Sequence, residues 1–166
     1  MKLTRLVPVA ALVALVGCSP SPTTAADVEG TIISEDVLSQ AVDGCAELGI
    51  ELPRNEMLRT LVIGQVVRSV AENNGVSMDQ ERIDRAAAGD PEIMHLMGND
   101  GCAKAVETNV LLGLVAEDIE EAKFMEEVMD LEVEVNPRYG DWDPEQATVG
   151  GSGSLSVPEN PEMLGN

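Results

Sequence analysis

The stretch Val110-Leu111-Leu112-Gly113-Leu114-Val115-Ala116 decides the fold class of this chain. Its side chains would be apolar on all sides of a helix, which indicates a segment that is buried on most sides. An acidic segment follows directly, so the sequence predicts one long helix from about Cys102 to about Met129. Aromatic residues make up only 2% of the chain and hydrophobic residues 44%, and such an aliphatic core favours helices over a sheet sandwich.

Four further segments carry apolar residues at helical spacing, and each begins at a residue that commonly starts a helix. The predicted helices run from Ser34 to about Leu48, from Pro53 to about Asn73, from Ser77 to about Ala88, and from Asp90-Pro91 to Gly98. Stop signals are present at Gly49 after the first segment, at Asn74-Gly75 after the second and at Gly98 at the end of the fourth.

Two short strands are predicted near the ends of the helical region. Val28-Glu29-Gly30-Thr31-Ile32-Ile33 is rich in β-branched residues and holds a glycine suited to a tight turn, so we expect a brief strand or hairpin there. Val133 and Val135 alternate with glutamates, which predicts a second strand that pairs with the Ile32 strand. The expected fold class is mainly α, with four to five helices and two short strands near the ends of the domain.

The first eighteen residues are typical of a lipoprotein signal peptide. Lys2 and Arg5 precede an apolar stretch of about 11 residues, which is too short to cross a hydrocarbon core that needs about 20. The stretch ends in Leu15-Val16-Gly17-Cys18, which resembles the bacterial lipobox. The resemblance implies that the sulfur of Cys18 bonds to diacylglycerol and that acyl chains such as palmitate hold the mature protein at the membrane. The alternatives are an ordinary secretory signal and an uncleaved anchor.

The sequence divides the chain into four parts. Residues 1–17 form the predicted signal peptide, and residues 18–26 form a tether rich in Ser, Pro and Thr. Residues 27–143 form the helical domain, and residues 144–166 form a Gly/Pro/Ser-rich tail that we expect to be disordered from about residue 150 onward. We therefore expect a lipid-anchored protein on the extracytoplasmic face of the cell membrane.

Charge excludes two classes of partner. The chain has 30 Asp and Glu residues against 10 Lys and Arg residues, for a net charge of −20. Nucleic acid is excluded because phosphate binding needs clustered Lys and Arg. Adhesion to anionic lipid through a basic patch is excluded for the same reason, so the acyl chains on Cys18 are the expected membrane contact.

Cys45 and Cys102 remain if lipidation consumes Cys18. Disulfides persist outside the cytoplasm, so this pair favours one bridge, with two buried free thiols or a reactive pair as the alternatives. The chain has no Cys-x-x-Cys motif, and His95 is its sole histidine. Zinc and thioredoxin-like chemistry are therefore poorly supported, and we expect no metal and no cofactor.

Two short motifs flank the helices. The first is the Val28–Ile33 turn, and the second is Asn136-Pro137-Arg138-Tyr139-Gly140, followed by Trp142. With the lipobox and the helices between them, the chain resembles the chaperone module of SurA-type and PrsA-type exported proteins. It is most similar to actinobacterial lipoproteins that carry a SurA N-terminal-like domain. That family has Val-Asn-Gly-x-x-Ile before its first helix, and Glu29 replaces the asparagine here.

The resemblance implies a chaperone-like module that binds unfolded or newly exported polypeptides. Such a module would present an apolar face between helices, and adaptable thioethers are candidates to line it. The candidates are Met57, Met78, Met94, Met97 and Met125. The alternative is that each of these side chains fills the core.

No catalytic set is recognisable in the sequence. Few residues follow Gly140, so we expect no parvulin prolyl isomerase domain and no isomerase activity. The chain has no Gly-x-Ser-x-Gly motif, no phosphate-binding loop and no second histidine, so we expect neither an enzyme nor a small-molecule substrate. The carboxylates between Glu117 and Glu121 lack the EF-hand pattern and predict a solvated face. The alternative function is an accessory envelope lipoprotein that docks one dedicated protein partner.

Overall fold

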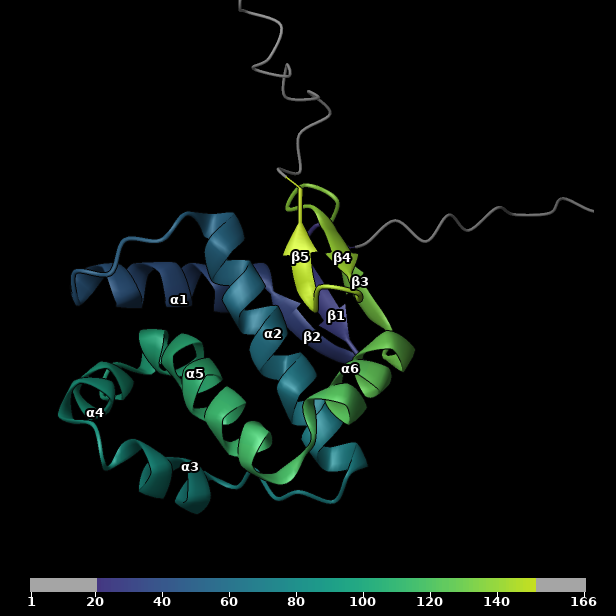
Figure 1. The fold of residues 1–166 in the computed structure, drawn as a ribbon. Helices are drawn as coiled ribbons and strands as arrows, with labels where there is room; N and C mark the ends of the chain where they lie inside the picture. The colour runs from purple at the N-terminus through teal and green to yellow at the C-terminus, as the bar shows by residue number, and fades with distance from the viewer. Residues whose placement is uncertain (1–20, 152–166) are drawn as a thin grey trace, which may run out of the picture.

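The computed structural model describes residues 21–151, which form a mainly helical fold with two small sheets, as Figure 1 shows. The helices in this range are α1 (Glu35–Glu47), α2 (Arg54–Asn73), α3 (Gln80–Ala87), α4 (Pro91–Met97), α5 (Asp100–Asp118) and α6 (Glu121–Asp130). The strands are β1 (Thr24–Val28), β2 (Thr31–Ser34), β3 (Val133–Val135), β4 (Asp141–Asp143) and β5 (Thr148–Gly150). The predicted mainly α class is confirmed. Residues 1–20, with the predicted signal peptide and Cys18, lie outside the described residues, as do residues 152–166 of the predicted tail.

Helices α2 and α5 form the centre of the helical part, with α1, α3 and α4 packed around α5 (Figure 1). Leu58 and Val62 of α2 and Leu111 of α5 are fully buried between them. The Thr108 hydroxyl of α5 donates a hydrogen bond to the Thr60 carbonyl of α2 at 3.1 Å. Gly64 faces Thr108, and a Cβ at Gly64 would collide with the Thr108 hydroxyl. The two helices therefore approach closely at a glycine.

The stretch Val110–Ala116 is buried on one side only. Leu111, Leu114 and Val115 face the core, but Leu112 is 39% exposed, and Gly113 and Ala116 are also exposed. The prediction of burial on most sides is therefore wrong for one face of α5.

The predicted helix over residues 102–129 is two helices. Ile119 and Glu120 adopt extended backbone between α5 and α6, and Ile119 is buried. Acidic residues destabilise the C-terminal end of a helix and stabilise its N-terminal end, where the macrodipole is positive. The break places Glu121 in the first turn of α6, which the macrodipole favours, but it also leaves Glu117 and Asp118 in the last turn of α5, which the macrodipole disfavours, so charge does not account for the break.

Helix caps follow the predicted pattern with one change. The Ser34 hydroxyl accepts a hydrogen bond from the Val37 amide at 3.2 Å and caps α1, and Asp90 caps α4. Asp79, and not Ser77, caps α3, because its carboxylate accepts from the Arg82 amide at 2.9 Å. The Ser77 hydroxyl instead lies 2.7 Å from the Asp79 carboxylate and donates to it.

The N-terminal sheet differs from the prediction in its pairing. Its strand order is β2-β1-β3, so β3 pairs with β1 and not with the strand that holds Ile32. Strand β1 begins at Thr24, inside the predicted tether, and its residues Ala25 and Ala26 are buried. A run of Thr and Ala has no alternating pattern, and only its neighbours on both sides show that it is a strand.

The domain also extends past its predicted end. Residues 144–150, which the sequence assigns to the tail, complete a hairpin in which β5 pairs with β4. Val149 of β5 is buried, and its carbonyl accepts a hydrogen bond from Arg59 Nε of α2 at 3.2 Å. A single apolar residue among Gly, Pro and polar residues was too weak a signal to predict this strand.

Candidate functional site

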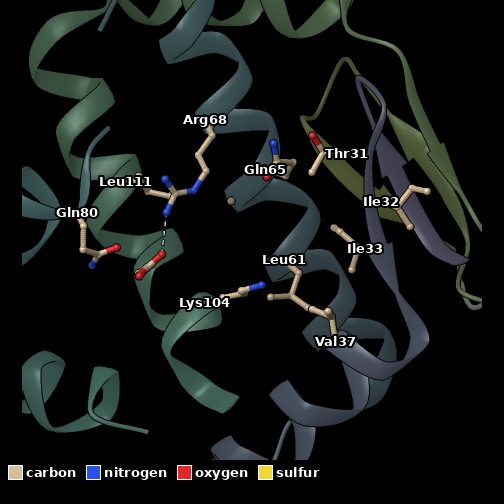
Figure 2. Close-up of a pocket in the computed structure, with 12 residues that line it drawn as sticks. Thr31, Ile32, Ile33, Val37, Leu61, Gln65, Arg68, Gln80, Lys104 and Leu111 are labelled. Carbon is tan, nitrogen blue, oxygen red and sulfur yellow. Dashed lines mark hydrogen bonds and ion pairs between the residues drawn. The ribbon is translucent and has the colours of Figure 1, made fainter. Parts of the chain in front are cut away.

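A concave site lies between β2, at the edge of the N-terminal sheet, and the two central helices. Its volume is about 410 Å³. Strand β2 forms one wall, α2 forms the floor, and α5 forms the opposite wall, as Figure 2 shows. We call it the β2 cleft; its lining residues are Thr31, Ile32, Ile33, Val37, Leu61, Gly64, Gln65, Arg68, Gln80, Lys104, Glu107 and Leu111.

The β2 cleft has an apolar part beside a polar part. Ile33 points into it from β2 and lies opposite Leu61 of α2 (Figure 2). Ile32, the next residue along the same strand, is 59% exposed, which makes it the most exposed of the large hydrophobic residues in the described part of the chain. An exposed isoleucine beside a concave apolar surface is typical of a binding site for an apolar partner.

An ion pair crosses the polar part of the β2 cleft. Arg68 of α2 donates to the Glu107 carboxylate of α5 at 2.7 Å, along the dashed line in Figure 2. Arg68 also donates to the Met78 carbonyl at 3.3 Å. Both side chains of the ion pair are partly buried, and the pair links α2 to α5 at this level of the cleft.

Lys104 gives the lining of the β2 cleft a net positive charge. None of the ion pairs within residues 21–151 includes Lys104. Since Glu107 is paired with Arg68, the lining residues carry one cation in excess, whereas the whole chain has a net charge of −20.

The five methionines named as candidates do not gather in one place. Met57 is fully buried in the core, so its proposed role in lining a client site is wrong, and the core-filling alternative holds for it. Met78 and Met97 pack partly buried against the core, and Met125 is half-buried on α6. Met94 is 46% exposed and shares with Met97 a second pocket of about 360 Å³ beside α4.

The motif Asn136–Gly140 joins the end of the chain to the start of the fold. The Asn136 side chain donates to the Thr24 carbonyl at 3.0 Å, and the Asn136 amide donates to the Ala25 carbonyl at 2.9 Å. Gly140 has a φ of 121°, and a Cβ there would collide with the Gly150 carbonyl. Pro137 is exposed, and Trp142 packs partly buried against the core. None of these residues lines the β2 cleft, so the motif acts on the fold.

Arg138 and Tyr139 of the same motif surround Glu35 at the start of α1. The Tyr139 hydroxyl donates to Glu35 Oε2 at 2.7 Å, and Arg54 donates to the same oxygen at 2.8 Å. Arg138 lies 3.7 Å from Glu35 Oε1. Burial by itself raises the pKa of the Glu35 carboxyl, but the hydrogen bonds from Arg54 and Tyr139 and the charge of Arg138 outweigh it and lower the pKa below its ordinary value. This cluster links α1 and α2 to the segment that precedes β4.

A disulfide links Cys45 of α1 to Cys102 of α5, the bridge that the cysteine count favoured. Its Cα atoms are 4.6 Å apart, across 57 residues of sequence. Gly44 and Gly101 stand beside it, and a Cβ at Gly44 would lie 2.7 Å from the Gly101 Cα. The bridge therefore holds a close contact between two helices, away from the β2 cleft.

Sequence reasoning missed the residues that line the β2 cleft. One signal was present: Ile32 and Ile33 are neighbours on a strand, where successive side chains point to opposite faces, so only one of them can face the core. Arg68 was a second signal, because it interrupts the apolar pattern of α2. Neither signal shows that this strand and Arg68 come together with α5 around one cleft.

Two searches of the described residues gave negative results. No helix within residues 21–151 combines the length and apolar character needed to cross a membrane. No group of three or more His, Cys, Asp or Glu side chains in that part of the chain is arranged to hold a metal ion. Comparisons with protein-family models, with curated proteins and with solved structures found no match for this chain.

Proposed function

We propose that this chain is an extracytoplasmic lipoprotein that binds unfolded or newly exported polypeptides as a chaperone-like module of the SurA N-terminal type. The observation that carries the proposal is the β2 cleft, which is open, concave and partly apolar and lies beside the exposed Ile32. The lipobox at Cys18 supports a location where exported chains emerge. In this proposal the protein holds its clients and does not isomerise them.

The composition of the β2 cleft supports binding without strict sequence specificity. Ile33, Val37 and Leu61 offer apolar contact, which is non-directional. Gln65 and Gln80 can each donate or accept hydrogen bonds, so they can meet either group of a client main chain. Such a lining favours many weakly bound clients over one tightly bound small molecule.

A test measures how well the protein prevents aggregation. The chain from residue 18 onward, carrying Cys18→Ser, is mixed with a urea-unfolded secreted protein upon dilution, and light scattering is recorded. The wild-type cleft is expected to delay scattering. Ile32→Asp is expected to abolish most of the delay, because it places a charge at the open edge of β2, next to a bound client.

Met129→Asp is the matched control. Met129 on α6 is 52% exposed, close to the exposure of Ile32, but it lies outside the β2 cleft. The control is expected to delay scattering as well as the unaltered protein does. Equal loss in the two variants would refute a specific role for the cleft. Capture of one stoichiometric partner, with no effect on unfolded proteins, would favour an accessory lipoprotein that docks a dedicated partner.

A further inference from the structure

Building on the proposed function, we propose that the open edge of β2 takes up an extended client segment as an additional strand, with an acidic client side chain next to an apolar one meeting Lys104. The proposal names both the backbone mode and the side-chain chemistry of the client. It rests on the position of β2 in the sheet, on the direction of its main-chain groups and on the charge of the β2 cleft.

Strand β2 is an edge strand with the β2 cleft along its open side. In the order β2-β1-β3, only β1 pairs with it. Thr31, Ile32 and Ile33 all line the cleft, although successive side chains of a strand point to opposite faces. A cavity that touches both faces lies beside the edge of the strand, which is where another strand would add.

The register of the hairpin formed by β1 and β2 directs the main-chain N–H and C=O of Ile32 toward this open side. Glu29 and Gly30 form a two-residue loop, and both have a positive φ, as the favoured tight hairpin turns require. Val28 and Thr31 flank the loop as a hydrogen-bonded pair, so in the next pair, Asp27 and Ile32, the main-chain groups point away from each other. None of the helix or loop hydrogen bonds within residues 21–151 reaches the main chain of Ile32.

The apolar part of the cleft fits alternate side chains of an added strand. Ile33 of β2, Val37 of α1 and Leu61 of α2 form this apolar part. Every second side chain of a strand bound to β2 would point into this apolar part, whereas the others would point to solvent. Main-chain hydrogen bonds would supply affinity for any extended segment, and the apolar part would select segments with alternating apolar residues.

The charge of Lys104 favours client segments that carry an acidic residue next to the apolar residue bound in the cleft. Lys104 and Leu61 both line the cleft (Figure 2), and Lys104 belongs to none of the ion pairs in the described part of the chain. Glu107, the one carboxylate of the lining, is already bound by Arg68. Charges farther away than about 8 Å are largely screened at physiological salt, so Lys104 outweighs the distant acidic surface at this point.

The first experiment tests the charge preference by fluorescence anisotropy. The probes are two labelled, C-terminally amidated peptides, Ser-Val-Thr-Val-Thr-Leu-Glu and the same peptide ending in Gln. The acidic peptide is expected to bind about threefold more tightly, the size of an exposed ion pair. Lys104→Gln is expected to remove this difference. Lys123→Gln, which changes an exposed lysine on α6 outside the cleft, is expected to preserve it. Equal binding of the two peptides by the unaltered protein would overturn the charge preference.

The second experiment tests strand addition. Ile32→Pro removes the outward N–H, which an edge strand tolerates, and is expected to weaken binding of both peptides about tenfold. Ile32→Thr keeps the N–H and is expected to weaken binding less. Amide hydrogen exchange of the unaltered protein provides a readout that needs no variant: saturating peptide is expected to slow exchange at Ile32 at least tenfold. Unchanged exchange at Ile32 with peptide bound would overturn strand addition.

Failure of this inference is distinguishable from failure of the proposed function. If unfolded clients are still held and Ile32→Asp still abolishes holding, but neither peptide protects Ile32, then the cleft binds clients without adding a strand. If the unaltered protein holds no unfolded client, the proposed function itself fails. A dimer that forms through β2 and is lost in Ile32→Pro would make a second copy the occupant of the edge, which also overturns the inference.

Discussion

Glu35 connects α1 to α2 and to the segment that holds Tyr139. Its carboxylate accepts hydrogen bonds from Arg54 of α2 and from Tyr139, and its own helix starts at that residue. The side chain is only 19% exposed, so the bonds are partly shielded from water. A neutral amide in place of the carboxylate would weaken the hydrogen bonds from Arg54 and Tyr139, because bonds to a charged acceptor are stronger than bonds to a neutral one.

Glu35→Gln is therefore expected to lower the free energy of unfolding by about 1–3 kcal/mol. Glu51→Gln, at an exposed position, is expected to change it by less than about 0.5 kcal/mol. Urea denaturation of both variants at neutral pH measures the difference. An equally small effect in both variants would contradict the role assigned to the cluster.

The same residue predicts a dependence of stability on pH. Hydrogen bonds and neighbouring cations hold the folded-state pKa of Glu35 below its ordinary value of 4.5. The folded state therefore favours the ionised form, and its stabilising contribution is fully present above pH 4.5. It is lost as the pH falls from there through the folded-state pKa. Denaturation of the unaltered protein and of Glu35→Gln along a pH series is expected to show the two stabilities converging at acid pH.

At the scale of elements, the packing of α2 against α5 requires a glycine. A Cβ at Gly64 would meet the Thr108 hydroxyl, whereas a Cβ at Gly113 of α5 would find open space. Gly64→Ala is expected to destabilise the protein by about 1–3 kcal/mol through overpacking. Gly113→Ala is expected to stabilise it by about 0.5–1 kcal/mol, because alanine favours a helix interior. Thermal unfolding compares the two variants, and shifts of the same sign would refute the close approach at Gly64.

Elements were predictable where a local signal defined them. Ser34 and Gly49 bound α1, and Asp90-Pro91 and Gly98 bound α4, so those helices match the sequence. The split between α5 and α6 was missed because helical periodicity continues through Ile119 and no glycine or proline marks the break. Strand β1 and the pairing of β3 depend on contacts between residues about 100 positions apart, which no short pattern encodes.

At the scale of the whole molecule, the charge distribution separates the β2 cleft from its surroundings. The net charge of −20 makes the body repel anionic lipid, so anchoring depends on the predicted acyl chains. The candidate site was not predictable at this scale. It arises where an edge strand, Arg68 of α2 and Lys104 of α5 come together, and these meet only through the tertiary fold.

Anchoring is tested by cell fractionation. The unaltered full chain is expected in the membrane fraction, and Cys18→Ser is expected to appear largely in the soluble fraction, because the sulfur that would carry diacylglycerol is missing. Cys45→Ser serves as the control, since it removes a cysteine of the disulfide and leaves the lipobox intact. Membrane association that persists in Cys18→Ser would contradict a lipid anchor at this residue.

Site-specific photocrosslinking in intact cells tests the central claim most directly. A photoreactive residue is placed at Ile32, beside the β2 cleft, and in a second variant at Met129, which is similarly exposed on α6. We predict that position 32 captures many different newly exported polypeptides and that position 129 captures few of them. Equal capture at the two positions, or capture of a single folded partner at position 32, would contradict the proposal that this cleft holds unfolded clients.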